Sequence, residues 1–283
     1  MGAALLLLVG TPPFTANINP PLTMRRSKNK AADPGRHFAR SCAIFATVLL
    51  PNLPALAQPT LLPGLGEADS RQVVAETAAP WSALGRVQTE LGGRCTGALL
   101  GPRTVLTAAH CLVAPRSRKL VQPRSVHFLR GYHLGQWQAE GRAIRFETGP
   151  GFDPARRGPA EADWAVLTLD RDVAGSVPSL VLERHVPSPG TPLMLGGYQQ
   201  DRPELLLADR ACHLLGVSGR RGAARLLWHD CAGTRGASGA PLLAQRASGE
   251  WAVLGIAVAV AKDAPRGLAV PAAALPESIG QEN

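Results

Sequence analysis

The fold class of this chain is limited most by its short apolar runs. Glycine, proline or polar turn residues interrupt these runs about every ten residues. Each run is long enough for a β-strand and too short for a helix that buries one face. The runs are Ser82–Gln88, Thr96–Leu100, Thr104–Leu106, Ser125–Leu129, Gly135–Ala139, Trp164–Leu169, Pro192–Leu195, Ala211–Val217, Ala224–His229, Gly239–Ala244, Trp251–Ala259 and Gly267–Val270. The 30 glycines and 25 prolines among 283 residues supply the turns between them. The pattern predicts an all-β fold, as a sandwich or a pair of barrels.

The segment Asp172–Ser179 (DVAGSVPS) is the best internal boundary, because its turn residues divide the β-rich part of the chain into halves of similar size. We expect the first half to span residues 73–178 and the second to span residues 179–283. Short helices are expected at Ala108–Leu112 and at Ala272–Gly280.

Residues 1–57 have the organisation of an export signal. A basic stretch ends at Arg40, the apolar run Cys42–Leu50 follows, and Ala55–Ala57 places small residues where signal peptidase cleaves. Cleavage after Ala57 would release a secreted or periplasmic product. A retained membrane helix is the weaker alternative, because the apolar run is too short to span a bilayer.

The segments on either side of this signal carry two further expectations. Residues 58–72 are rich in proline and glycine, which predicts an extended N-terminal arm. Residues 1–23 precede the basic stretch with an apolar run of their own, Ala3–Val9, so Met24 is an alternative start to Met1.

The net charge of +9 is unevenly distributed. Residues 1–57 carry six basic side chains and one acidic side chain, which leaves 24 basic and 20 acidic residues in the rest of the chain. No run of lysine and arginine with interleaved aromatic side chains occurs there. We therefore expect no nucleic-acid partner, and no membrane contact beyond the export signal.

Four cysteines remain once Cys42 leaves with the signal, namely Cys95, Cys111, Cys212 and Cys231. Four cysteines allow three pairings, and their clustering favours two local disulfides, 95–111 and 212–231. An exported chain meets an oxidising compartment, and each loop would be stabilised by roughly 3 kcal/mol. A zinc site is the alternative, but the absence of a CxxC pair and the export signal disfavour it. No metal or other cofactor is expected.

Three short strings contain the residues that nucleophilic catalysis needs: Thr107–Cys111 (TAAHC), Asp163–Leu169 (DWAVLTL) and Gly233–Pro241 (GTRGASGAP). A serine hydroxyl is a weak nucleophile and needs a base, for which histidine is suited by its pKa near 6.5. A carboxylate behind the histidine holds one tautomer, and glycines let backbone N–H groups face a developing oxyanion.

Each string also has an ordinary structural explanation. Most histidines are structural and this chain has seven, an aspartate before a strand is usually a solvated turn residue, and Ser238 alone would be a turn serine. The catalytic interpretation is favoured because His110, Asp163 and Ser238 occur together in an exported all-β chain. An α/β-hydrolase is excluded, since Gly236–Ala240 lacks the last glycine of its nucleophile elbow and that fold orders its triad differently.

The strings resemble the motifs of the trypsin-like (chymotrypsin-fold) serine peptidases, especially the secreted bacterial branch near the glutamyl endopeptidases. TAAHC matches the histidine motif in full, and Cys95–Leu100 (CTGALL) supplies its partner cysteine. DWAVLTL matches the aspartate motif, and GASGAP matches the serine motif loosely. The resemblance runs from about Asp69 to Val270. It implies two packed six-stranded antiparallel β-barrels with the active site between them.

The resemblance also implies a role for each motif residue. Ser238, from the second barrel, would attack the scissile carbonyl. His110 would act as general base and then as acid, and Asp163 would orient it; both would come from the first barrel. The backbone N–H groups of Gly236 and Ser238 would form the oxyanion hole.

Ala237 departs from the family pattern. The digestive branch has an aspartate at this position, which receives a new N-terminal amine after propeptide cleavage. Ala237 has no side chain that could do this, so that activation salt bridge is excluded. Bacterial relatives often carry an uncharged residue here and remain active. We expect removal of the export signal alone to yield active enzyme.

Substrate-binding residues are also implied by the resemblance. They are the strand residues Ala257, Val258, Ala259 and Val260 and the loop residues Thr234 and Arg235. Ala257 stands where glutamyl endopeptidases place a histidine that holds a glutamate side chain. A small or medium apolar side chain is therefore expected on the amino side of the scissile bond. Arg235 leaves an acidic side chain as the alternative.

These observations predict a monomeric, secreted serine endopeptidase that acts on polypeptides through an acyl-enzyme intermediate. One alternative is a catalytically silent binding or adhesion module on the same fold. Another is a peptidase fold that acts mainly on esters.

Overall fold

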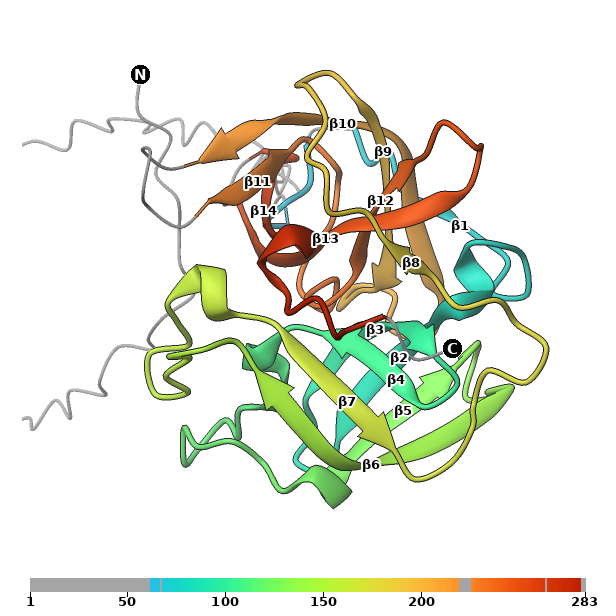
Figure 1. The fold of residues 1–283 in the computed structure, drawn as a ribbon, viewed down its shortest axis with the longest axis vertical. Coiled ribbons are helices and arrows are strands. Elements are labelled where there is room, and N and C mark those ends of the chain that lie inside the picture. Colours follow the sequence, from blue (N-terminus) through green and yellow to red (C-terminus); the bar gives the residue numbers. More distant parts are fainter. Residues whose placement is uncertain (1–61, 67, 219–224, 263, 281–283) are drawn as a thin grey trace, which may run out of the picture. The chain divides into compact units, whose positions relative to one another are not determined.

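The computed structural model describes residues 62–66, 68–218, 225–262 and 264–280. The predicted export signal, its cleavage site and the alternative start at Met24 lie outside these residues. The described elements are strands joined by turns and short 3-10 helices, and Figure 1 shows them gathered into two groups of strands. No helix in this part of the chain is long and apolar enough to cross a membrane.

The first barrel is closed and runs in the order β2-β3-β4-β7-β6-β5, with every neighbouring pair antiparallel. Its strands are β2 (Leu84–Thr89), β3 (Arg94–Gly101), β4 (Thr104–Thr107), β5 (Val126–Arg130), β6 (Ala139–Thr148) and β7 (Ala165–Leu169). Strand β7 shows the alternation that a barrel requires, since Ala165, Leu167 and Leu169 are buried while Val166 and Thr168 are half-buried. These three buried residues belong to a core cluster that also includes residues of the second barrel.

The second barrel closes in the order β9-β10-β11-β14-β13-β12. Its strands are β9 (Pro192–Tyr198), β10 (Leu206–Ser218), β11 (Leu226–His229), β12 (Pro241–Gln245), β13 (Trp251–Val260) and β14 (Gly267–Pro271). Two short strands extend this sheet: β1 (Gln72–Val73) pairs with β10, and β8 (Val181–Leu182) pairs in parallel with β13. The predicted fold of two six-stranded antiparallel barrels is confirmed.

Two local predictions were wrong in detail. The run Gly135–Ala139 was expected to be a strand, but it is mostly a turn, and the strand β6 begins at Ala139. In β6 the fully buried positions are Gly141 and Ala143, and a side chain at Gly141 would meet Leu169 at 3.0 Å. Phe146 also packs against the core, but it follows an irregularity in the pairing between Ala143 and Arg145. Small residues at the buried positions and this irregularity together hide the strand from a search for apolar periodicity.

The expected helices are both single 3-10 turns. The first, η2, spans Ala109–Leu112, close to its predicted range. The C-terminal one, η5, spans only Ala272–Ala274 instead of reaching Gly280. Pro276 explains the difference, since proline removes a helical N–H and disfavours helical backbone in the residue before it.

The described part of the predicted arm lies against the second barrel. Strand β1 joins the arm to β10, Leu65 is buried, and the Gly64 N–H donates to the Ala261 carbonyl at 2.8 Å. We refer below to residues 62–66 and 68–73 as the arm.

Both predicted disulfides are present, Cys95–Cys111 in the first half and Cys212–Cys231 in the second. The first joins β3 to the turn η2 and the second joins β10 to the residues that follow β11.

Candidate active site

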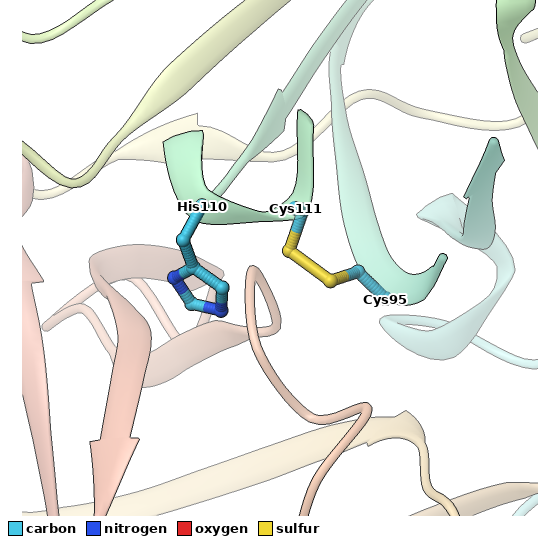
Figure 2. Close-up of side chains that lie close together, drawn as sticks. All are labelled: Cys95, His110 and Cys111. Atoms are coloured by element: carbon cyan, nitrogen blue, oxygen red, sulfur yellow. A yellow bond between two sulfur atoms is a disulfide. The ribbon is translucent and has the colours of Figure 1, made fainter. Parts of the chain in front are cut away.

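His110 lies on η2, directly after the buried strand β4. Ala108 and Ala109 before it are fully buried, and Cys111 after it is bonded to Cys95 on β3. Figure 2 shows His110 and Cys111 leaving the same turn, with the disulfide running to Cys95. The turn is therefore fixed on both sides of the imidazole, whose side chain remains 17 % exposed.

Asp163 holds His110 through both of its carboxylate oxygens. The His110 ring Nδ1 lies 2.6 Å from Oδ2, and the His110 backbone N–H donates to Oδ1 at 2.8 Å. Asp163 is buried directly before β7, and the pairing of Thr107 on β4 with Ala165 on β7 brings the two segments together. A carboxylate only accepts, so Nδ1 carries the proton and Nε2 is left as the basic nitrogen.

Ser238 lies on a loop of the second barrel that touches the first barrel. The Thr96 N–H on β3 donates to the Ser238 carbonyl at 2.9 Å. The approach is so close that a side chain at Gly239 would meet the Thr96 carbonyl and the Thr107 hydroxyl at 2.3 Å. Cys111 Sγ lies 3.8 Å from the Ser238 carbonyl, so Ser238 is adjacent to the turn that carries His110.

The Ser238 hydroxyl makes no hydrogen bond to any residue that the structure describes. Ser238 is half-buried, and its hydroxyl is not among the buried unpaired side-chain atoms of the described residues. Catalytic hydrogen bonds are often long in a free enzyme and shorten in the complex with substrate.

The loop around Ser238 presents two backbone donors. The Arg235 carbonyl accepts from the Gln200 N–H at 2.7 Å, which turns the Gly236 N–H of the same trans peptide the opposite way. The Ala237 carbonyl accepts from the Ala240 N–H at 2.9 Å, so the Ser238 N–H of that trans peptide also points the opposite way. Among the described residues neither of these two N–H groups has an acceptor.

Glycine is required at position 236. Its φ is +93°, a backbone conformation that other residues rarely adopt, and a side chain there would lie 2.4 Å from the Tyr198 carbonyl. The Gly236 carbonyl in turn accepts from the Thr96 hydroxyl at 2.9 Å. The peptides on both sides of Gly236 are therefore fixed by contacts outside the loop.

A comparison with known families decides what kind of protein this is. Residues 95–256 match the sequence model of the trypsin-like peptidase domain. The chain belongs to this family. The matched range contains His110, Asp163 and Ser238 and supports a serine-type peptidase, a hydrolase with polypeptide substrates.

Solved structures show the same fold as this peptidase. A Glu endopeptidase has 20 % sequence identity and a TM-score of 0.60, with 73 % of this chain and 93 % of that chain covered. A thermostable serine protease from an extremophilic microorganism, AL20, has 19 % identity and a TM-score of 0.50, with 67 % and 91 % covered. The predicted resemblance to the trypsin-like peptidases is confirmed by the family match, and the Glu endopeptidase shares the fold of this chain. No curated protein matches the chain.

The six predicted substrate-binding residues of the peptidase have different environments. Thr234 and Ala257 are buried, and both backbone polar groups of Ala257 are used, since it accepts from Gly239 and donates to Ala240. Val258, Ala259 and Val260 are half-buried on β13, next to an irregularity in its pairing with β14. Arg235 is exposed.

Two groups of side chains have the composition of metal sites, but they do not fit a metal. One is Cys95, His110 and Cys111, and the other is Cys212, Asp230 and Cys231. In both groups the two sulfurs are bonded to each other, so neither is the thiolate that a metal requires.

Sequence reasoning missed the residues that support the Ser238 loop. Gln199, Gln200 and Asp209 hold it through hydrogen bonds, as does Thr96 from the other barrel. Gln199, Gln200 and Asp209 belong to no recognisable motif, and Thr96 lies within CTGALL but was not predicted to contact this loop. Only their long-range contacts identify them.

Proposed function

We propose that this peptidase is a secreted serine endopeptidase that uses His110, Asp163 and Ser238 and forms an acyl-enzyme intermediate. The observation that carries the proposal is the double contact between Asp163 and His110, with the ring Nδ1 2.6 Å from the buried carboxylate. Such a contact fixes both the position and the tautomer of the general base. The N–H groups of Gly236 and Ser238, which have no acceptor within the described part of the chain, support it further.

In the proposed mechanism, the Ser238 hydroxyl attacks the scissile carbonyl while His110 Nε2 removes its proton. The negative charge that develops on the carbonyl oxygen is stabilised by the N–H groups of Gly236 and Ser238. His110 then donates the proton to the leaving amine, and the acyl group stays on Ser238. Water activated by His110 hydrolyses this ester and restores the enzyme. Asp163 remains ionised and stabilises the imidazolium in both halves of the reaction.

The proposed substrate is a polypeptide with a small or medium apolar side chain before the scissile bond. Ala257 is apolar and buried, so it provides no positive group for an acidic side chain. Arg235 is exposed beside the loop, which keeps an acidic side chain as the alternative. We propose a secreted or periplasmic location, on the basis of the export signal and the two disulfides, and a monomer as the expected state.

Cleavage-site profiling tests this proposal. The secreted protein is incubated with a denatured proteome, and new termini are mapped for the wild type and for Ser238→Ala. We expect many cleavage sites with a shared preference for the residue before the scissile bond, and a loss of about 10⁶-fold in rate for the variant. An intact wild-type protein that produces no new termini and hydrolyses neither peptide nor ester substrates would support a silent binding module.

A further inference from the structure

Three consecutive backbone amides hold the start of the loop that carries Ser238. The Ala232 N–H donates to Asp209 Oδ2 at 2.8 Å, and the Gly233 N–H donates to the Gly64 carbonyl at 3.1 Å. The Thr234 N–H donates to Gln199 Oε1 at 2.8 Å. These contacts fix the loop just before Arg235 and Gly236, the two residues of the peptide that presents the first oxyanion donor.

All three acceptors belong to the arm or are held by it. Gly64 is an arm residue. Asp209 Oδ2 also accepts from the Ser70 hydroxyl at 2.8 Å, and Gln199 Oε1 also accepts from Arg71 Nη1 at 2.7 Å. The arm therefore contacts the loop once directly, through Gly64, and twice indirectly, once through the Asp209 side chain and once through the Gln199 side chain.

Arg71 is the most buried charged group in this arrangement, with a side chain only 1 % exposed. Its guanidinium forms hydrogen bonds with both carboxylate oxygens of Asp69, at 2.8 and 2.9 Å, and with both of Asp201, at 3.0 and 2.7 Å. Burial by itself lowers the pKa of Arg71, but the two carboxylates outweigh burial and raise it. Because the Arg71 guanidinium is buried and paired with carboxylates on two sides, its position is fixed. Its hydrogen bond to Oε1 in turn fixes the Gln199 carboxamide.

Gly64 makes the second close contact. Its φ is +83°, and a side chain there would lie 1.9 Å from the Gly233 carbonyl and 2.9 Å from Val260 Cβ. The arm thus reaches both the Ser238 loop and the end of strand β13, which are the two segments predicted to bind the substrate.

We propose that the arm, through Gly64, Ser70 and Arg71, positions the oxyanion loop from within the chain. The proposal rests on the proposed function and adds positioning residues to it. Ala237 cannot receive a terminal amine, and the arm supplies fixed contacts to the same loop without one. Activity then requires the arm to be present and docked, and it does not require a newly formed N-terminus.

The alternative is that the arm only stabilises the second barrel. The two possibilities differ in their effect on a folded enzyme, because an oxyanion donor displaced by about 1 Å costs about 100-fold in rate, whereas a stabilising contact costs nothing once the protein is folded.

A matched pair of glycine variants separates these possibilities. Gly64→Ala introduces a methyl group against Gly233, whereas Gly92→Ala has the same kind of backbone, with a φ of +85°, and nothing within 4 Å. Arg71→Met and Arg130→Met form a second pair of buried arginines, of which Arg130 lies in the first barrel. Ser70→Ala is a milder variant that keeps the test available should Arg71→Met fail to fold.

The measurements are kcat/KM on a peptide substrate and the affinity of a peptidyl boronate, both well below the melting temperature. We expect Gly64→Ala and Arg71→Met each to lose about 100-fold in kcat/KM and about 100-fold in affinity for the boronate. The loss in kcat/KM should come mainly from kcat. Gly92→Ala and Arg130→Met should stay within about twofold of the wild type in both quantities. Ser70→Ala should lose several-fold. Equal kinetics within each pair would overturn the proposal.

Amide hydrogen exchange gives a readout that does not depend on activity. Residues 232–234 should exchange faster in Gly64→Ala and Arg71→Met than in their matched controls, even if the wild type hydrolyses no substrate. Unchanged exchange together with unchanged kinetics would overturn the positioning role alone. If the variants exchange faster than their controls but the wild type itself hydrolyses no substrate, the proposed function would be overturned and the positioning of the loop by the arm would stand.

Discussion

His229 is a histidine that the second barrel encloses completely. It lies at the end of β11 with no exposed surface, and neither ring nitrogen has a hydrogen-bond partner among the described residues. A side chain at Gly267 on β14 would lie 2.5 Å from the ring, so the glycine makes room for it. Burial lowers the pKa of His229 to about 4, against the smaller opposing effects of Asp230 and Asp209.

This pKa predicts how stability depends on pH. The unfolded chain has an ordinary histidine pKa near 6.5, so between pH 6.5 and about 4 it binds a proton that the folded protein does not. The free energy of unfolding should fall by roughly 3 kcal/mol as the pH falls through that range. Urea unfolding at pH 7, 5.5 and 4 measures this fall.

The control is His229→Leu, which removes the titrating group and with it the two unpaired ring nitrogens at this position. The difference in unfolding free energy between the wild type and this variant should change with pH in favour of the variant as the pH falls. A difference that stays constant from pH 7 to pH 4 would show that His229 is not buried in its neutral form.

At the level of the secondary-structure elements, the disulfide Cys95–Cys111 links β3 to the turn that carries His110. It closes a loop with a sequence separation of 16 residues. Replacement of both cysteines by serine should lower the free energy of unfolding by about 3 kcal/mol, because the unfolded chain regains the entropy of that loop. Denaturant unfolding under oxidising conditions measures the change.

The second disulfide is the natural comparison. Cys212–Cys231 closes a loop with a sequence separation of 19 residues, so its double serine variant should lose a similar amount. A loss below about 1 kcal/mol for the Cys95–Cys111 pair would contradict a role in stabilising the turn around His110.

The strands differ in how well the sequence predicts them. Strands β4, β7 and β13 lie largely within predicted runs, because large apolar side chains occur at their buried positions. Strand β6 was missed, since its fully buried positions carry only Gly141 and Ala143, and Phe146, which also packs against the core, follows an irregularity in the strand pairing. A pattern of apolar residues identifies a strand only when its buried face carries large side chains.

At the scale of the whole molecule, the candidate catalytic residues could be found from the sequence because each lies in a short local motif. The residues that support them could not be found in this way. Arg71 and Gln199 are 128 positions apart, and Ser70 and Asp209 are 139 apart. Contacts over such separations depend on the closed topology of the second barrel, which no local pattern specifies.

The described chain joins its two barrels where the chemistry is proposed to occur. Thr96 on β3 contacts both Gly236 and Ser238, and Gly239 lies against Thr107 at the end of β4. The proposed base and the proposed nucleophile come from different barrels, so these contacts between the barrels set their separation. The proposed mechanism therefore depends on the packing of the two barrels as much as on the triad residues.

Active-site labelling tests that mechanism most directly. The folded protein is treated with a fluorophosphonate, and the modified peptide is located by mass spectrometry. We expect one adduct on Ser238, absent from His110→Ala and retained in the folded control Arg130→Met. A folded wild-type protein that takes no label, or takes it on another residue, would contradict the assignment of Ser238 as the nucleophile.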